Sequence, residues 1–153
     1  MSKIIPLSPA DKPLFSNSSD IVEDDTLSSN ILPWKVMIID DDTAVHDVSK
    51  IVLRNFTYKD RKLEFIHGYS GHEAQQLIQQ HPDTAIIILD VMMETDTAGL
   101  DTVKYIRNVI QNKKVRIILR TGQSGSAPEH LIVRLYDIND YVNKSELTSQ
   151  YLQ

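Results

Sequence analysis

Two short apolar runs that each end in acidic residues constrain the fold of this chain most strongly. The first, residues 36–39, is followed by three aspartates at 40–42, and the second, residues 85–89, is followed by Asp90. Uninterrupted apolar runs of this length are typical of strands buried on both faces, as in a parallel sheet. Open α/β sheets bind their ligands at the carboxyl ends of such strands. The two runs therefore predict an acidic pocket at one edge of a parallel sheet.

Strand and helix patterns alternate along the rest of the chain. Strands are predicted at about 35–39, 63–67, 85–90, 115–120 and 141–142, and the segment 63–67 alternates partly, as an edge strand does. The polar segment 57–62 is predicted to be a loop. Apolar residues at helical spacing predict helices over about 43–55, 71–81, 100–111 and 128–136, and a last helix that opens at 145. Five alternations indicate an α/β fold of parallel βαβ units with right-handed crossovers and helices on both sheet faces.

The first 33 residues differ in composition from the residues that follow. They hold four of the six prolines and none of the five glycines, and no helical or strand period persists there. This composition predicts a disordered leader, with docking of residues 14–15 or 21–22 on the domain or on a partner as the alternative. We therefore expect a polar leader over 1–33 and one folded domain over 34–153.

The composition also argues against several classes of function. The net charge of -5 disfavours a broad nucleic-acid-binding face. The absence of cysteine excludes disulfides and thiolate metal sites. No apolar run approaches the roughly 20 residues of a membrane span, and the N-terminus lacks the apolar core of a signal peptide. We expect a cytoplasmic domain that binds neither nucleic acid nor membrane.

Convergence of Asp40, Asp41 and Asp90 would have a chemical consequence. Three carboxylates in a small cleft repel one another, and this repulsion raises the cost of ionising them. A divalent cation removes that cost, and oxygen ligands of this kind are those that Mg2+ prefers. The pocket therefore predicts Mg2+ together with an anionic ligand that shares the metal.

Three further residues follow the later strands at the same predicted edge of the sheet. Thr121 offers a hydroxyl, Gly122 lets the backbone come close to a ligand, and Lys144 offers a cation. With the acids and the metal, these groups suit a phosphoryl group, whose transfer depends mainly on positioning and charge neutralisation. An aspartate can itself be the nucleophile in such chemistry.

Some neighbouring residues have simpler interpretations. Asp42 precedes the helix that begins near residue 43, so we expect it to cap that helix. The five histidines show no spacing typical of metal ligands, and we expect them at the surface or at sheet edges.

Four motifs in this order resemble the receiver domain of two-component response regulators, the CheY-like family. They are residues 36–42, 87–93, 118–122 and 140–144. The resemblance covers about residues 35–150. It implies a flavodoxin-like, doubly wound parallel sheet of five strands in the order 2-1-3-4-5, with helices on both faces.

The resemblance also implies roles for the residues around the acidic pocket. Asp90 would be the phosphoacceptor. Asp41 would be a direct Mg2+ ligand, Asp40 a supporting one, and Met92 would contribute its backbone carbonyl. Met92 and Gln123 also match the two variable positions that tune the lifetime of the phosphoryl group in this family.

Residues after the later strands would then sense the phosphoryl group. Thr121 would hold one of its oxygens close to the backbone at Gly122, and Lys144 would pair with the phosphoryl group or with Asp90. Tyr141 matches the aromatic position that turns inward when the Thr121 hydroxyl moves to the phosphoryl group.

The sequence departs from the family pattern in three places. Glu94 stands where a proline is usual, the loop 91–99 is one residue longer, and Ser145 replaces another usual proline. Residues 93–96, 120–123 and 136–141 resemble receivers that precede cyclic-dinucleotide signalling domains, notably phosphodiesterases. This branch implies a downstream output domain.

The leading hypothesis is a phosphorylation switch whose partners are a sensor histidine kinase or a phosphotransfer protein and the output domain. On this hypothesis the domain is a phosphoacceptor with slow autodephosphorylation and not an enzyme. The alternative is a receiver-shaped docking module that is never phosphorylated. A haloacid-dehalogenase-like hydrolase is disfavoured because Met92 stands where that family has its second aspartate. Formation of a homodimer is left open.

Overall fold

The structure is a computed structural model and describes residues 31–122 and 129–143, without the side chains of 129–131 and 143. Contacts divide the chain into two compact units, Met1–Leu32 and Pro33–Gln153. The elements below belong to the second unit. The predicted disorder of the leader and the predicted last helix lie outside the described residues.

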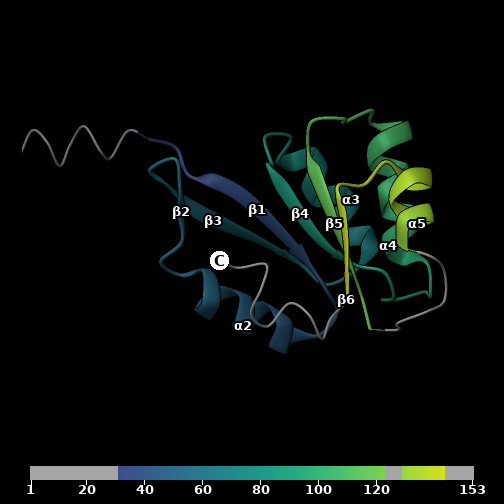
Figure 1. Cartoon of the computed structure of the whole chain (residues 1–153), viewed down its shortest axis with the longest axis horizontal. Coiled ribbons are helices and arrows are strands. Elements are labelled where there is room, and N and C mark those ends of the chain that lie inside the picture. Colours follow the sequence, from purple (N-terminus) through teal and green to yellow (C-terminus); the bar gives the residue numbers. More distant parts are fainter. Residues whose placement is uncertain (1–30, 123–128, 144–153) are drawn as a thin grey trace, which may run out of the picture. The chain divides into compact units, whose positions relative to one another are not determined.

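Six strands form one sheet in the order β2-β3-β1-β4-β5-β6 (Figure 1). Their bounds are β1 (Trp34–Ile39), β2 (Thr57–Tyr58), β3 (Arg61–Gly68), β4 (Ile86–Asp90), β5 (Arg116–Thr121) and β6 (Asp140–Asn143). The strands from β3 to β6 pair in parallel, and only β2 is antiparallel to its neighbour. The parallel part has the predicted 2-1-3-4-5 order, so the fold prediction is confirmed.

The sequence prediction of a loop over 57–62 is wrong, because this segment forms a hairpin between β2 and the start of β3. Lys59 and Asp60 have φ angles of 49° and 60°, which suits a two-residue turn that matches the twist of the strands. The indole Nε1 of Trp34 donates a hydrogen bond to the carbonyl of Tyr58 over 3.0 Å. The pairing therefore depends partly on a residue of β1, which local sequence does not reveal.

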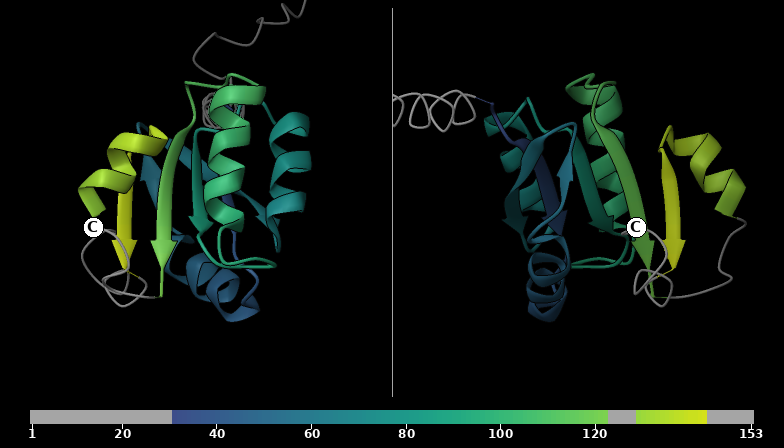
Figure 2. Two further views of the ribbon diagram at one scale, coloured as in Figure 1. Left: turned by 90° about the vertical axis from the view of Figure 1, so that its right-hand side faces the viewer. Right: turned by 60° about the vertical axis from the view of Figure 1, so that its left-hand side comes forward.

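Helices cover both faces of the sheet (Figure 2). They are α2 (Thr43–Leu53), α3 (Gly71–Gln80), α4 (Ala98–Lys104), a π-helical segment (Tyr105–Val109) and α5 (Glu129–Tyr136). The helix predicted over 100–111 thus begins two residues earlier and widens after its second turn. α2 lies on one face, and α3 and α4 lie on the other.

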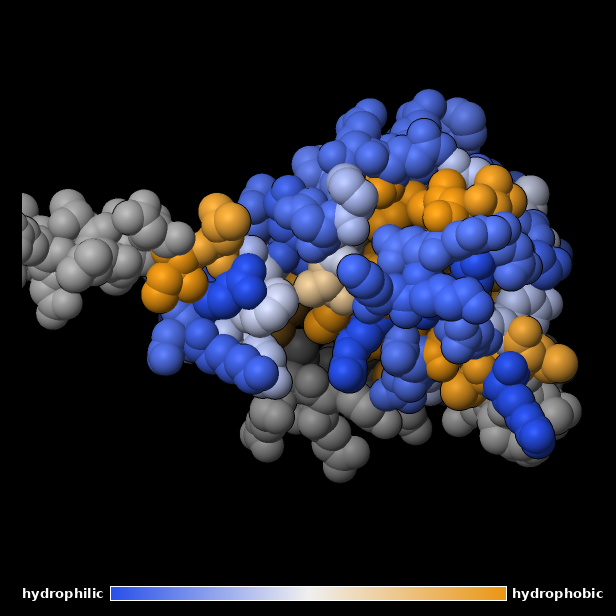
Figure 3. All heavy atoms as spheres, turned by 90° about the horizontal axis from the view of Figure 1, so that it is seen from above, coloured by the Kyte–Doolittle hydropathy of each residue, from blue (hydrophilic) through white to orange (hydrophobic). Residues whose placement is uncertain are grey.

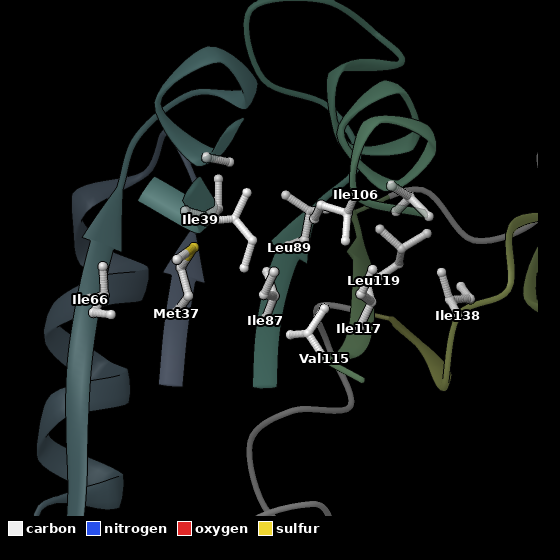
Figure 4. Close-up of a cluster of buried hydrophobic side chains, with 13 residues drawn as sticks. Met37, Ile39, Ile66, Ile87, Leu89, Ile106, Val115, Ile117, Leu119 and Ile138 are labelled. Atoms are coloured by element: carbon white, nitrogen blue, oxygen red, sulfur yellow. The ribbon is translucent and has the colours of Figure 1, made fainter. Parts of the chain in front are cut away.

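The core lies between the sheet and the pair α3 and α4 (Figure 4). Alternate residues of the central strands point into it, because side chains along a strand alternate between the two faces. The fully buried members from these strands are Met37, Ile39, Ile87, Leu89, Ile117 and Leu119. Burying each such side chain stabilises the fold by about 1.5–3 kcal/mol. The central strands are therefore held firmly where their carboxyl ends meet.

The surface seen in Figure 3 is mostly hydrophilic, with hydrophobic residues in separate groups. Among the described residues, the large apolar side chains with the highest exposure are Leu32, Ile51 and Leu135, each 76% exposed. None of the helices in the described part of the chain is long and apolar enough to span a membrane.

Candidate functional site

The carboxyl ends of β1 and β4 bring three aspartates together. These strands are parallel neighbours in which Ile39 pairs with Leu89, so Asp40 and Asp90 emerge at the same edge. One carboxylate oxygen from each of Asp40, Asp41 and Asp90 lies within 4.8 Å of the other two. Asp40 and Asp90 are buried and Asp41 is exposed. The predicted convergence is therefore present, and three carboxylates at this separation are a donor set that suits Mg2+.

Local hydrogen bonds fix the first of these acids. Asp40 accepts a hydrogen bond at Oδ1 from the backbone N–H of Asp42 over 2.9 Å. Asp42 in turn accepts one from the N–H of Ala44 over 2.9 Å, so the predicted cap of α2 is confirmed. The turn after β1 thus begins α2 and orients the Asp40 carboxylate in the same few residues.

His46 supports the backbone beneath the acidic cluster. Its Nε2 donates to the carbonyl of Asp40 over 2.7 Å, and its Nδ1 lies 2.7 Å from Nδ1 of His67. The side chain is only 1% exposed, so its predicted surface position is wrong. Burial lowers the pKa of His67, and so do Lys50 and His46 beside it. A neutral pair can make both hydrogen bonds when His67 donates to His46.

Arg120 places a guanidinium against the cluster. Its Nη1 is 3.6 Å from Oδ2 of Asp40, and the residue is 8% exposed. Burial lowers the pKa of Arg120, whereas the charges of Asp40, Asp90 and Asp42 raise it. Arg120 therefore gives the acids a basic partner within the described residues before any metal or phosphoryl group is considered.

Gly99 holds the loop 91–99 close to the backbone that follows β4. Its N–H donates to the carbonyl of Val91 over 2.9 Å. A Cβ at this position would overlap the carbonyl oxygen of Asp90 and would lie 2.8 Å from Cα of Val91. Only glycine fits this close approach, so Gly99 determines the path of the chain away from Asp90.

Glu94 ties the same loop to the start of α3. Its carboxylate accepts hydrogen bonds from the N–H groups of Gly71, over 3.0 Å, and His72, over 3.2 Å. Burial opposes ionisation of Glu94, but bonds from the N–H groups of Gly71, Glu94 and His72 prevail and lower its pKa. Glu94, which stands where the family usually has a proline, thus supplies two hydrogen-bond acceptors at the N-terminus of α3. The helix dipole also favours an anion at this position.

We expect Glu94→Ala to lower the free energy of unfolding at pH 7 by about 1 kcal/mol, the usual cost of a lost helix cap. Because the pKa of Glu94 is lowered in the folded state, its contribution is present above the ordinary carboxyl pKa. It is lost as the pH falls through the lowered value. Urea unfolding at pH 7 and at pH 3 measures both effects, and the two proteins should differ less at pH 3.

Asp96→Ala is the matched control, because it removes an acid from the same loop and no described hydrogen bond or ion pair involves its side chain. An equal loss of stability in both variants would show that the capping bonds of Glu94 contribute nothing.

The other predicted residues lie at neighbouring strand ends. Thr121 ends β5 and is 5% exposed, and Gly122 follows it. Tyr141 lies in β6, paired with Leu119, and packs half-buried against the core. The Met92 side chain is 36% exposed in the loop after β4. The predicted residues Gln123 and Lys144 lie outside the described residues.

Residues 36–152 match the family described as "Response regulator receiver domain". The chain belongs to this family of receiver domains of two-component response regulators. The match covers the five parallel strands apart from the first two residues of β1, and it includes every predicted site residue. The motifs that suggested the resemblance therefore lie within one contiguous family match.

Relatives with both short and long chains are similar to this receiver domain. The 3'3'-cGAMP-specific phosphodiesterase 2 of Vibrio cholerae serotype O1 is 46% identical over 121 residues, which are 79% of this chain and 23% of that protein. Chemotaxis protein CheY1 of Helicobacter pylori (strain ATCC 700392 / 26695) is 31% identical over 110 residues, 72% of this chain and 84% of that protein. This receiver chain thus spans less than a quarter of the phosphodiesterase.

Solved structures agree on the fold. The Mn(2+)-bound form of response regulator Rcp1 has a TM-score of 0.61 and 19% sequence identity, covering 76% of this chain and 84% of that one. The response regulator domain of Thermotoga maritima CheB has a TM-score of 0.58 at 19% identity, covering 74% and 80%. At such identities the likeness shows the fold alone.

Sequence reasoning did not assign roles to Arg120, His46 or the carboxylate of Glu94. For Arg120 a signal was present, because this charged residue directly follows the apolar run 117–119 at the edge where the acids were expected. For His46 and Glu94 the partners lie on other elements, so no local pattern indicated them.

Proposed function

We propose that this receiver accepts a phosphoryl group on Asp90 in a reaction that requires Mg2+. The observation that supports this proposal is the convergence of Asp40, Asp41 and Asp90 at the end of the central strands. A carboxylate oxygen of Asp90 attacks phosphorus, the bond from phosphorus to a histidine nitrogen of the donor breaks, and the imidazole leaves. The product is an acyl phosphate on Asp90. Bound Mg2+ would neutralise charge on the phosphoryl oxygens during this transfer.

The metal would be held by Asp41 directly, with Asp40 and Asp90 in support and the backbone carbonyl of Met92 as a further ligand. Oxygen donors from carboxylates and a carbonyl are the chemistry that Mg2+ prefers. The side chains of Met92 and Gln123 would tune how long the phosphoryl group survives.

Phosphorylation would act through the strand ends beside Asp90. Thr121 would donate its hydroxyl to a phosphoryl oxygen near Gly122, and Lys144 would pair with the phosphoryl group. Tyr141 would then turn inward and alter the face formed by α5, β6 and the segment that follows. This is a two-state element biased by a local change of charge.

The donor would be a sensor histidine kinase or a phosphotransfer protein. The output would be a domain elsewhere in a longer protein, because the receiver matches 23% of the similar Vibrio cholerae phosphodiesterase. That similarity favours turnover of a cyclic dinucleotide as the regulated activity. The receiver itself would be a phosphoacceptor with slow autodephosphorylation and not an enzyme.

Intact mass after incubation with acetyl phosphate and Mg2+ tests the proposal. We expect a gain of one phosphoryl group that is absent in Asp90→Asn and is abolished by chelating the metal. The matched control is Asp96→Asn, which removes an acid from the following loop and should still be phosphorylated. Failure of the folded, Mg2+-binding wild type to gain a phosphoryl group would contradict the proposal and favour the non-phosphorylated docking module.

A further inference from the structure

The position of Arg120 follows from the pairing of β4 with β5. In this register Arg120 is the partner of Asp90 on the neighbouring strand. Its guanidinium Nη1 reaches to 3.6 Å from Oδ2 of Asp40, at the end of β1 on the other side of β4. The side chain therefore spans the strand that carries the proposed phosphoacceptor. A rigid, buried part of the sheet determines this placement.

The surroundings of Arg120 are those of a buried cation among acids. The residue is 8% exposed, and its Nε has no hydrogen-bond partner among the described residues. Burying an ion is costly unless opposite charges compensate for the lost hydration. Asp40, Asp90 and Asp42 supply that compensation. An arginine keeps its charge at any ordinary pH, so Arg120 is a permanent positive charge beside the acids.

We propose that Arg120 is an internal counter-cation that stabilises the metal-free acidic cluster and thereby weakens the binding of Mg2+ to it. The inference rests on the proposed function for the location of the metal site, and it adds a residue that regulates this site.

The argument depends on the signs of the charges. Without metal, the positive charge of Arg120 offsets part of the repulsion among Asp40, Asp41 and Asp90. A divalent ion bound to the same carboxylates lies close to the guanidinium, and water screens their repulsion poorly in a buried site. The same side chain therefore favours the empty cluster and disfavours the metal-bound one. A doubly negative phosphoryl group would reverse this balance, so the site favours metal and anion together over metal alone.

Calorimetric titration with Mg2+ of the purified protein tests the inference, with Arg120→Met to remove the charge and Arg120→Lys to keep it. We expect Arg120→Met to bind Mg2+ roughly tenfold more tightly and Arg120→Lys to stay close to the wild type. The metal-free melting temperature of Arg120→Met should fall by about 5 °C, and saturating Mg2+ should restore it. Arg116→Met, an exposed position on the same strand, should change neither value.

Wild-type or weaker Mg2+ binding by Arg120→Met would overturn the inference. If that variant fails to fold without metal, Arg120→Gln replaces it, because glutamine is uncharged and polar, and the same tightening is expected. The inference would also be overturned if neither the wild type nor Arg120→Gln bound Mg2+. Removing the positive charge would then not allow the acids to bind the metal. The inference and the proposed function can fail separately. If the variant binds Mg2+ more tightly but the wild type is not phosphorylated, the proposed function is contradicted and the inference stands.

Discussion

Replacing Gly99 with alanine is expected to lower the free energy of unfolding by about 3 kcal/mol and to impair phosphorylation of Asp90. The added Cβ would overlap the carbonyl oxygen of Asp90 and lie 2.8 Å from Cα of Val91. Both are backbone atoms, so a change of side-chain rotamer cannot relieve the overlap. The loop must move, and with it the hydrogen bond that Gly99 donates to Val91 over 2.9 Å.

Two measurements separate the effects of this substitution. Urea unfolding gives the loss of stability, and the rate of mass gain with acetyl phosphate gives the effect on Asp90. Asp96→Ala serves as the control in the same loop and should match the wild type in both. If Gly99→Ala kept wild-type stability, the loop would be able to yield, and Gly99 would not determine the position of the backbone after β4.

The acidic cluster was predictable because its members follow short, uninterrupted apolar runs that are typical of buried strands. The apolar runs before Asp40 and Asp90 indicate buried parallel strands, and parallel strands deliver their last residues to one edge. The carboxylates then converge if β1 and β4 are neighbours in the sheet. The same argument placed Thr121 at the end of the next strand.

Features that depend on contacts between distant segments were not predictable in this way. The hairpin of β2 receives a hydrogen bond from Trp34 on β1, and the segment that forms it is mostly polar. Glu94 caps a helix that begins 23 positions earlier in the chain, so its function depends on how the loop after β4 packs. His46 lies in an amphipathic helix pattern that says nothing of a hydrogen bond to Asp40. In each case the polar group is satisfied by a partner that only the tertiary fold brings near.

Arg120 shows why a motif can be recognised without its chemistry being understood. The residue belongs to the string that suggested the family, yet the string does not show that its side chain turns toward Asp40. The strand register sets Arg120 beside Asp90, and the distance of 3.6 Å from its Nη1 to Oδ2 of Asp40 shows that the side chain reaches that acid. The charge balance of the pocket therefore follows from the structure and could not be counted from the aspartates alone.

Asp41→Asn is expected to weaken Mg2+ binding by at least about 100-fold, more than the loss typical of residues that only support a metal ligand. Asp41 is the exposed member of the cluster, and no described hydrogen bond or ion pair involves its carboxylate. Asp40, by contrast, accepts a hydrogen bond from the N–H of Asp42 and lies beside Arg120. A metal can therefore bind the Asp41 carboxylate without breaking any described hydrogen bond or ion pair of the folded protein.

Thermal unfolding with and without Mg2+ distinguishes this role from a structural one. A ligand present at 100 times its dissociation constant stabilises the native state by about 2.7 kcal/mol, and Asp41→Asn should lose most of this gain. Its metal-free melting temperature should not fall, because the substitution removes one of three carboxylates that repel one another. Asp42→Asn is the matched control, since it removes the same charge from the adjacent position and asparagine caps a helix equally well. It should retain most of the stabilisation by Mg2+. Full stabilisation of Asp41→Asn by Mg2+ would instead place the metal away from this carboxylate, and the assignment of Asp41 as the direct ligand would then be wrong.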